Sequence, residues 1–316
     1  MGRPATVCIG ALAIVLLLAG CTRPGPPAAA RSLTPSLSDV GVLPSVSTPR
    51  ITTTEGMQLP IERYDATAAE RKIVGDAVDF WVGKCMSSFG LSWVPAGSDD
   101  RQPVPQLVRA YGVADPVTAA ELGYHTAGDS SGKPLSPPRL TPDQIKVYGG
   151  ARDGSGRPKA ALFRDKMVPA GGCARQGLVA VVDDPELDPN SVADQILISM
   201  GAKARSDARV AAVIASWSSC MSRAGYQFSD PLDAVSRAMT AGPKPTAAEI
   251  RTAVADITCK NKVNLLGTWY AVDAGYERLA IRQNSKQLGA VQSAWRAAVT
   301  KAASSLGRPA PPAHAP

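Results

Sequence analysis

The sequence predicts a mainly α-helical protein of two related helical halves, each with one disulfide that closes a long loop. Apolar residues recur at three- and four-residue steps behind helix-capping motifs over much of the chain. A nine-residue cysteine motif occurs twice, and four cysteines remain for pairing after two are assigned to processing. Strand signals are weak, with 57–64 and 179–182 as the only candidates.

The chain divides by composition into a leader, a linker, two folded parts and a tail. Pro, Ser and Thr dominate after the leader, and no helical or alternating apolar period is present there. Such composition is typical of a flexible, partly extended tether. We expect a signal segment at 1–20, a tether at 21–56, helical halves at 57–190 and 191–305, and a disordered tail at 306–316.

The N-terminal segment predicts export and lipidation. A short basic stretch with Arg3 precedes the uncharged apolar run Cys8–Gly20, which is too short for a spanning helix and fits the core of an export signal. The run ends in Leu-Ala-Gly-Cys at Cys21, which resembles a lipobox. This resemblance implies cleavage before Cys21 and acylation of its thiol. We expect the chain at the outer face of the cell membrane, with membrane lipid as its partner through Cys21.

Helix starts are the clearest local signals. Thr67-Ala-Ala-Glu70 and Thr246-Ala-Ala-Glu249 both read as capping boxes. The first opens a helix that ends at Gly90, and the second opens a long helical stretch to about residue 287. Further helices are expected at 115–123, 141–148, 192–200, 207–224 and 292–306.

The repeated motif has the frame C-M-S-x-x-G-φ-x-aromatic. Its copies are 85–93 and 220–228, and a tryptophan lies about one turn upstream in each, at Trp81 and Trp217. We expect the tryptophan and the cysteine to share a buried face. The glycine should cap the helix in a left-handed conformation, so that the aromatic residue folds back.

Four cysteines remain in the folded part once Cys8 leaves with the leader and Cys21 takes lipid. An even number in an exported chain predicts disulfides, and four cysteines allow three pairings. One bridge per repeat favours Cys85–Cys173 and Cys220–Cys259. A zinc site is the alternative, but there is no C-x-x-C spacing and little histidine. We expect no metal and no cofactor.

Several segments resemble secreted lipoproteins of high-GC Gram-positive bacteria whose activity is uncharacterised. The resemblance implies an extracytoplasmic location and disulfides, and brings no activity. It rests on LPIERYDATAAE (59–70), the W…CM…G helix ends, YGVADPVTAAELGYH (111–125), VPAGGCARQ (168–176) and ADITCKNKVNLLGTWYAVDAGYE (255–277).

Candidate catalytic chemistry is sparse. His125 is the one histidine outside the tail, and a structural or surface role is expected for it. The sequence Gly-Gly-Cys173-Ala-Arg is similar to the G-C-x-R setting of wall transpeptidases, in which a cysteine thiolate is the nucleophile. The hydroxyl residue usual before that glycine is absent, and the β-rich scaffold is not predicted. An enzyme using Cys173 and His125 is therefore the alternative to a non-enzymatic role.

Composition bounds the partners. The formal net charge is +7, and no dense Lys/Arg run is present, which argues against nucleic acid. A mild basic excess suits an anionic cell-envelope polymer or another envelope protein. A solute-binding lipoprotein would show alternating strands and helices, which the sequence lacks. We therefore expect a lipid-anchored binding or scaffolding protein at the cell envelope.

Overall fold

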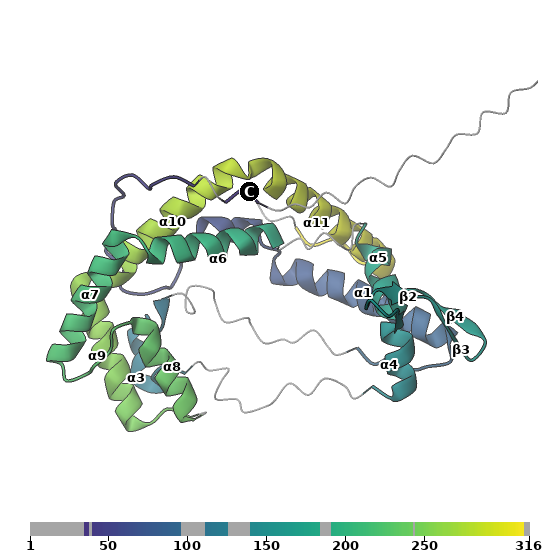
Figure 1. Ribbon diagram of the computed structural model, residues 1–316, viewed down its shortest axis with the longest axis horizontal. Coiled ribbons are helices and arrows are strands. Elements are labelled where there is room, and N and C mark those ends of the chain that lie inside the picture. The colour runs from purple at the N-terminus through teal and green to yellow at the C-terminus, as the bar shows by residue number, and fades with distance from the viewer. Residues whose placement is uncertain are drawn as a thin grey trace, which may run out of the picture. The chain divides into compact units, whose positions relative to one another are not determined.

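The computed structural model describes residues 35–37, 40–95, 111–125, 140–183, 191–242 and 244–312. The predicted leader, the predicted lipidation site Cys21 and residues 184–190 lie outside these ranges. Residues Leu33–Pro316 form one compact unit. The predicted mainly helical fold with two disulfides is confirmed (Figure 1).

The predicted helices form close to their expected bounds, whereas the helices at 60–64, 172–181 and 231–241 were not predicted. The helices of the described part are η1 (Pro60–Tyr64), α1 (Ala68–Ser88), α3 (Pro116–Leu122), α4 (Pro142–Gly149), α5 (Gly172–Val181), α6 (Ser191–Arg205), α7 (Ala208–Arg223), α8 (Pro231–Ala241), α9 (Ala247–Val263), α10 (Leu265–Gln283) and α11 (Ser285–Leu306). Both capping boxes form, at α1 and at α9. The predicted long stretch from 246 is broken twice, because Asn264 takes a left-handed conformation and the ladder is interrupted again at Asn284.

Both strand predictions were wrong. Residues 60–64 form the short helix η1, and 179–181 are the last turn of α5. Two hairpins lie elsewhere: β1 (Ala151–Arg152) pairs with β2 (Pro158–Lys159), and β3 (Ala161–Phe163) pairs with β4 (Lys166–Val168), both antiparallel. The apolar run at 179–182 is too short to distinguish a helix from a strand, because a short run fits both the helical period of 3.6 residues and a buried strand.

Two groups of helices surround separate cores. The α1 group comprises α1, α4, α5 and the C-terminal half of α11, and the α10 group comprises η1, α3 and α6–α10. One bridge lies in each group: Cys85–Cys173 joins α1 to α5, and Cys220–Cys259 joins α7 to α9. Each bridge closes a loop long enough to stabilise the fold by about 4 to 5 kcal/mol in the chain-entropy model.

The two cores do not follow the predicted division at 190. Helix α3, from the expected first half, packs on α9, whereas α11, from the second, packs on α1 and α5. Leu288 and Val291 of α11 belong to the core of the α10 group, and Val299 and Ala302 to that of the α1 group. The halves therefore exchange elements and are not consecutive domains.

Residues 36–37 and 40–51, here called the strap, lie along α10 in the opposite direction. The Ser36 N–H donates to Asn284 Oδ1 (2.7 Å) at one end, and the Ile51 N–H donates to Asn264 Oδ1 (3.3 Å) at the other. Leu43 of the strap is buried against Gly275 of α10. The prediction of a flexible tether up to residue 56 was wrong over this segment, because α10 supplies its hydrogen-bond partners and a face without side chains.

Candidate functional site

The two copies of the cysteine motif end their helices with the same geometry. Gly90 and Gly225 both have positive φ, of 70° and 89°. The residue after each glycine donates its N–H to the methionine carbonyl, from Leu91 to Met86 (3.1 Å) and from Tyr226 to Met221 (2.9 Å). This is the pattern of a Schellman cap, and both methionines are fully buried.

The upstream tryptophans are not equivalent, contrary to the expectation. Trp217 lies three residues before its cysteine, is fully buried, and donates from Nε1 to Asp256 (2.8 Å). Trp81 lies four residues before its cysteine, is half-buried, and donates to Ser305 Oγ (3.2 Å) on α11. One residue more turns a side chain by about 100° around a helix, so Val82 takes the position of Trp217.

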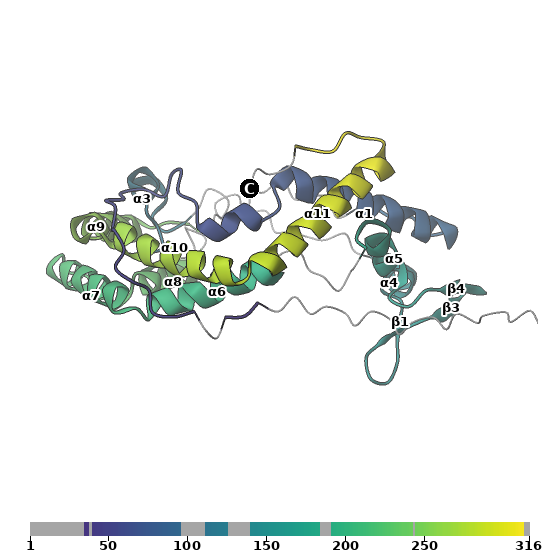
Figure 2. The ribbon, with the colours of Figure 1, turned by 90° about the horizontal axis from the view of Figure 1, so that it is seen from above.

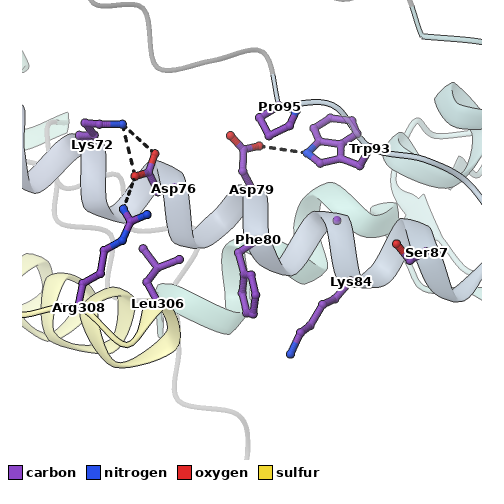
Figure 3. Close-up of a pocket in the computed structure, with 11 residues that line it drawn as sticks. Lys72, Asp76, Asp79, Phe80, Lys84, Ser87, Trp93, Pro95, Leu306 and Arg308 are labelled. Atoms are coloured by element: carbon purple, nitrogen blue, oxygen red, sulfur yellow. Dashed lines mark hydrogen bonds and ion pairs between the residues drawn. The ribbon is translucent and has the colours of Figure 1, made fainter.

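The motif aromatics differ in what surrounds them. Phe228 packs into a core completed by α8, and Arg237 of α8 lies over its ring at 4.9 Å. Trp93, at the matching position, stacks on Tyr148 of α4, with ring centroids 4.8 Å apart. Helix α4 thus lies against the aromatic residue of the first copy as α8 lies against that of the second, but in the described part of the chain α1 stays open beside Trp93. A groove remains there along α1 (Figure 3).

The α1 groove, as we call it, has a volume of about 760 Å³. Seven α1 residues form its floor, the segment after Gly90 forms one wall, and the C-terminal end of α11 forms the other (Figure 3). The lining residues are Lys72, Asp76, Asp79, Phe80, Gly83, Lys84, Ser87, Trp93, Pro95, Leu306 and Arg308.

Charged groups of both signs are fixed in the α1 groove. Asp76 accepts from Lys72 Nζ (3.2 Å) and from Arg308 Nη1 (3.0 Å), so it carries two cations (Figure 3). Arg308 lies in the segment predicted to be a disordered tail. That prediction was wrong here, because Gly307 ends α11 in a left-handed cap and the Arg308 N–H donates to Ala303 O (3.0 Å).

Asp79 and Lys84 each lie beside an aromatic side chain of the groove. Trp93 donates from Nε1 to Asp79 Oδ1 (3.4 Å), as Figure 3 shows. Partial burial raises the pKa of Asp79, the charge of Asp76 adds to the rise, and the Trp93 hydrogen bond opposes it. Lys84 Nζ lies 4.6 Å from the centre of the Phe80 ring, and both side chains are exposed. Figure 3 shows Phe80 and Lys84 on one side of α1 and Asp79 with Trp93 on the other, so the groove presents an aromatic ring and a cation at one side and a carboxylate at the other.

The residues of the candidate enzyme site are not brought together. Cys173 is fully buried and bonded to Cys85. His125 is buried in the α10 group, where Nδ1 lies 2.8 Å from Glu249 Oε1 and Nε2 lies 2.9 Å from Gly242 O. Both ring nitrogens of His125 thus have protein partners. Cys173 has no free thiol to act as a nucleophile while it is bonded to Cys85.

The pocket beside His125 is smaller and mostly apolar. It has a volume of about 310 Å³ between Thr54, the 112–115 segment, α3 and Val235. Below it, the buried Lys260 donates to Val113 O (2.8 Å) and lies 3.0 Å from Asp256 Oδ2. These charges hold the 111–115 segment on α9. Among the described residues, no group of three or more His, Cys, Asp or Glu side chains is placed to bind a metal ion.

The groove residues were missed because the prediction compared the two motif copies only for what they share. Counted from the cysteines, Asp76, Asp79, Phe80 and Lys84 correspond to Ala211, Ile214, Ala215 and Ser219. The positions that hold charged or aromatic residues in the first copy hold small or neutral residues in the second. That contrast is visible in the sequence, and it marks the helix face that became the groove.

Comparisons of the chain with protein-family models, with curated proteins and with solved structures gave no match. None of the helices in the described ranges is long and apolar enough to cross a membrane.

Proposed function

We propose that this chain is a lipid-anchored extracytoplasmic lipoprotein that binds a polypeptide segment of another envelope protein in the α1 groove, without catalysing a reaction. The observation that carries the proposal is the difference between the motif copies. Both keep the buried cysteine, methionine and capping glycine, and only the first presents Phe80, Lys84 and Asp79 in an open groove.

The charge pattern favours a polypeptide as the occupant. The lining holds two carboxylates, Asp76 and Asp79, as well as cations, so a ligand with groups of both signs matches it better than a polyanion does. An extended peptide offers backbone N–H groups, side chains of either sign and apolar groups, which match Asp79, Lys84 and Phe80. Aromatic and cationic residues in a partly apolar groove are the usual anchors of such interfaces.

The anchor is tested first, in cells fed labelled palmitate. We expect label on the wild type and its recovery with membranes, and we expect neither for Cys21→Ser. Both disulfides should form in the Cys21→Ser chain, because Cys21 belongs to neither bridge. Label on Cys21→Ser, or free thiols at the four bridge cysteines, would contradict the assignment.

The groove is tested with a phage-displayed library of random peptides panned on the immobilised folded chain. Selected peptides should bind at least tenfold more weakly to Phe80→Ser and to Lys84→Glu. Ile198→Ser, which removes a 70% exposed side chain of α6, is the matched control and should bind as the wild type does. Peptides that ignore both groove variants would overturn the assignment. Binding of poly(glycerol phosphate) that depends on Lys84 would instead make an anionic polymer the occupant.

A further inference from the structure

The β3–β4 hairpin holds two large apolar side chains side by side in solvent. Leu162 and Met167 are direct cross-strand partners and are 70% and 60% exposed. Cross-strand partners point to the same face of a hairpin. The two side chains therefore form one apolar patch, which we call the hairpin patch, and Figure 2 shows β3 and β4 beside α4.

The hairpin is fixed to the helices behind it. The inner residue Phe163 meets Phe89 edge to face at 6.4 Å, and Lys166 Nζ donates to Ser88 O (2.6 Å). Arg164 pairs with Asp143 of α4 (2.8 Å). These contacts use the opposite face of the hairpin. Leu162 and Met167 are therefore exposed although the hairpin itself is held against the helices.

Basic residues outnumber acidic ones in the two hairpins. Residues 151–168, which form both hairpins, contain five basic and two acidic residues. Arg157 and Lys159, which precede Leu162 by a few residues, are exposed. Exposed apolar side chains on a basic segment are the pattern of a surface that meets anionic lipid, since the apolar groups enter the headgroup boundary and the cations contact the phosphates.

The strap shortens the distance from the anchor to the folded part. It is held at Ser36 by Asn284, so little more than the residues between Cys21 and Ser36 can act as a spacer. Fully extended, they reach about 50 Å. A chain lipidated at Cys21 is therefore confined close to the bilayer, where a weak surface contact has a high effective concentration.

We propose that the hairpin patch, with the exposed basic residues Arg157 and Lys159, docks the folded part on an anionic lipid surface. The proposal rests on the proposed function, because lipid on Cys21 is what holds the chain near a membrane. It adds a second, reversible contact that is independent of the acyl chains and of the α1 groove. Docking would also fix which side of the molecule faces away from the membrane.

The test uses the chain from Thr22 onward, which lacks leader and lipid and contains the whole compact unit Leu33–Pro316. Sedimentation with vesicles of phosphatidylcholine alone is compared with equimolar phosphatidylglycerol and phosphatidylcholine. We expect binding to the anionic vesicles only, weakened at high salt. Leu162→Ser/Met167→Ser and Arg157→Glu/Lys159→Glu should each lower the bound fraction at least fivefold.

Two matched controls separate the patch from general surface properties. Val117→Ser/Ile198→Ser removes two side chains that are 63% and 70% exposed, and Arg282→Glu/Lys286→Glu reverses two exposed charges of other helices. Both should bind as the wild type does. Wild-type chain that stays in solution, or hairpin variants that bind as well as the controls, would overturn the proposal. Binding to soluble poly(glycerol phosphate) but not to vesicles would also overturn it. None of these outcomes touches the palmitate result for Cys21.

Discussion

The two copies of the cysteine motif share the residues that end a helix and differ in the residues around that end. In both, the cysteine and methionine are buried, the glycine has positive φ and the next N–H returns to the methionine carbonyl. The second copy is then covered by α8 and buried polar pairs, and the first remains open along the α1 groove. The shared residues are structural, and the proposed binding site lies where the copies differ.

The largest expected effect concerns what the copies share. Replacing either bridge by alanines, Cys85→Ala/Cys173→Ala or Cys220→Ala/Cys259→Ala, should lower the free energy of unfolding by about 4 kcal/mol, because both close long loops. Chemical denaturation measures the loss. If the loss of only one of the two bridges lowers the free energy of unfolding, the two copies do not stabilise the fold equally.

The next effect belongs to the α10 group and depends on pH. Asp273 and Glu277 are buried in α10, where burial raises the pKa of Asp273 to about 7 and that of Glu277 to about 8. Tyr111 donates to Asp273 (2.6 Å) and the Ile61 N–H to Glu277 (3.1 Å), and both bonds oppose the rise.

A raised carboxyl pKa stabilises the fold fully below the unfolded pKa, near 4, and that contribution is lost as pH rises through the folded value. The free energy of unfolding should therefore fall by about 2 to 4 kcal/mol between pH 5 and pH 8. Asp273→Asn/Glu277→Gln should flatten the dependence and stabilise the chain at pH 8. An unchanged slope in this variant would place the titrating groups elsewhere.

The tryptophans should separate the copies by a smaller amount. Trp217→Phe removes the buried N–H that donates to Asp256 Oδ1 and should cost about 2 kcal/mol. Trp81→Phe removes a bond to Ser305 in a half-buried setting and should cost less than about 1 kcal/mol. Equal losses in thermal denaturation would contradict the different burial of the two rings.

Sequence patterns predicted the parts of this fold that local chemistry decides. Both capping boxes, the glycine caps and the bridge pairing follow from residues a few positions apart or from the repeat itself. The exchange of α3 and α11 between cores could not be predicted, because it depends on which apolar faces meet after the chain has folded. The strap was missed for a related reason. A proline-rich segment has no periodicity, and its partners, Asn264 and Asn284, lie more than 200 residues away.

The β3–β4 hairpin also escaped prediction. Its turn residues Arg164 and Asp165 both have positive φ, where glycine or asparagine would be the usual signal. The ion pair of Arg164 with Asp143 and its position over the Phe163 ring, at 5.0 Å, offset that conformation. Tertiary contacts of this kind leave no trace in a local pattern.

The smallest expected effect on stability, with the largest on binding, comes from exchanging the groove face. Asp76→Ala, Asp79→Ile, Phe80→Ala and Lys84→Ser together give α1 the corresponding residues of α7. Because these side chains lie outside the core, the variant should keep both bridges and unfold within about 1 kcal/mol of the wild type.

Isothermal titration of this exchanged variant with a peptide selected on the wild type is the most direct test. We predict a folded, disulfide-bonded protein that no longer binds the peptide. Binding that survives the exchange would show that the α1 groove is not the site. A variant that fails to fold would show that the difference between the two motif copies is structural.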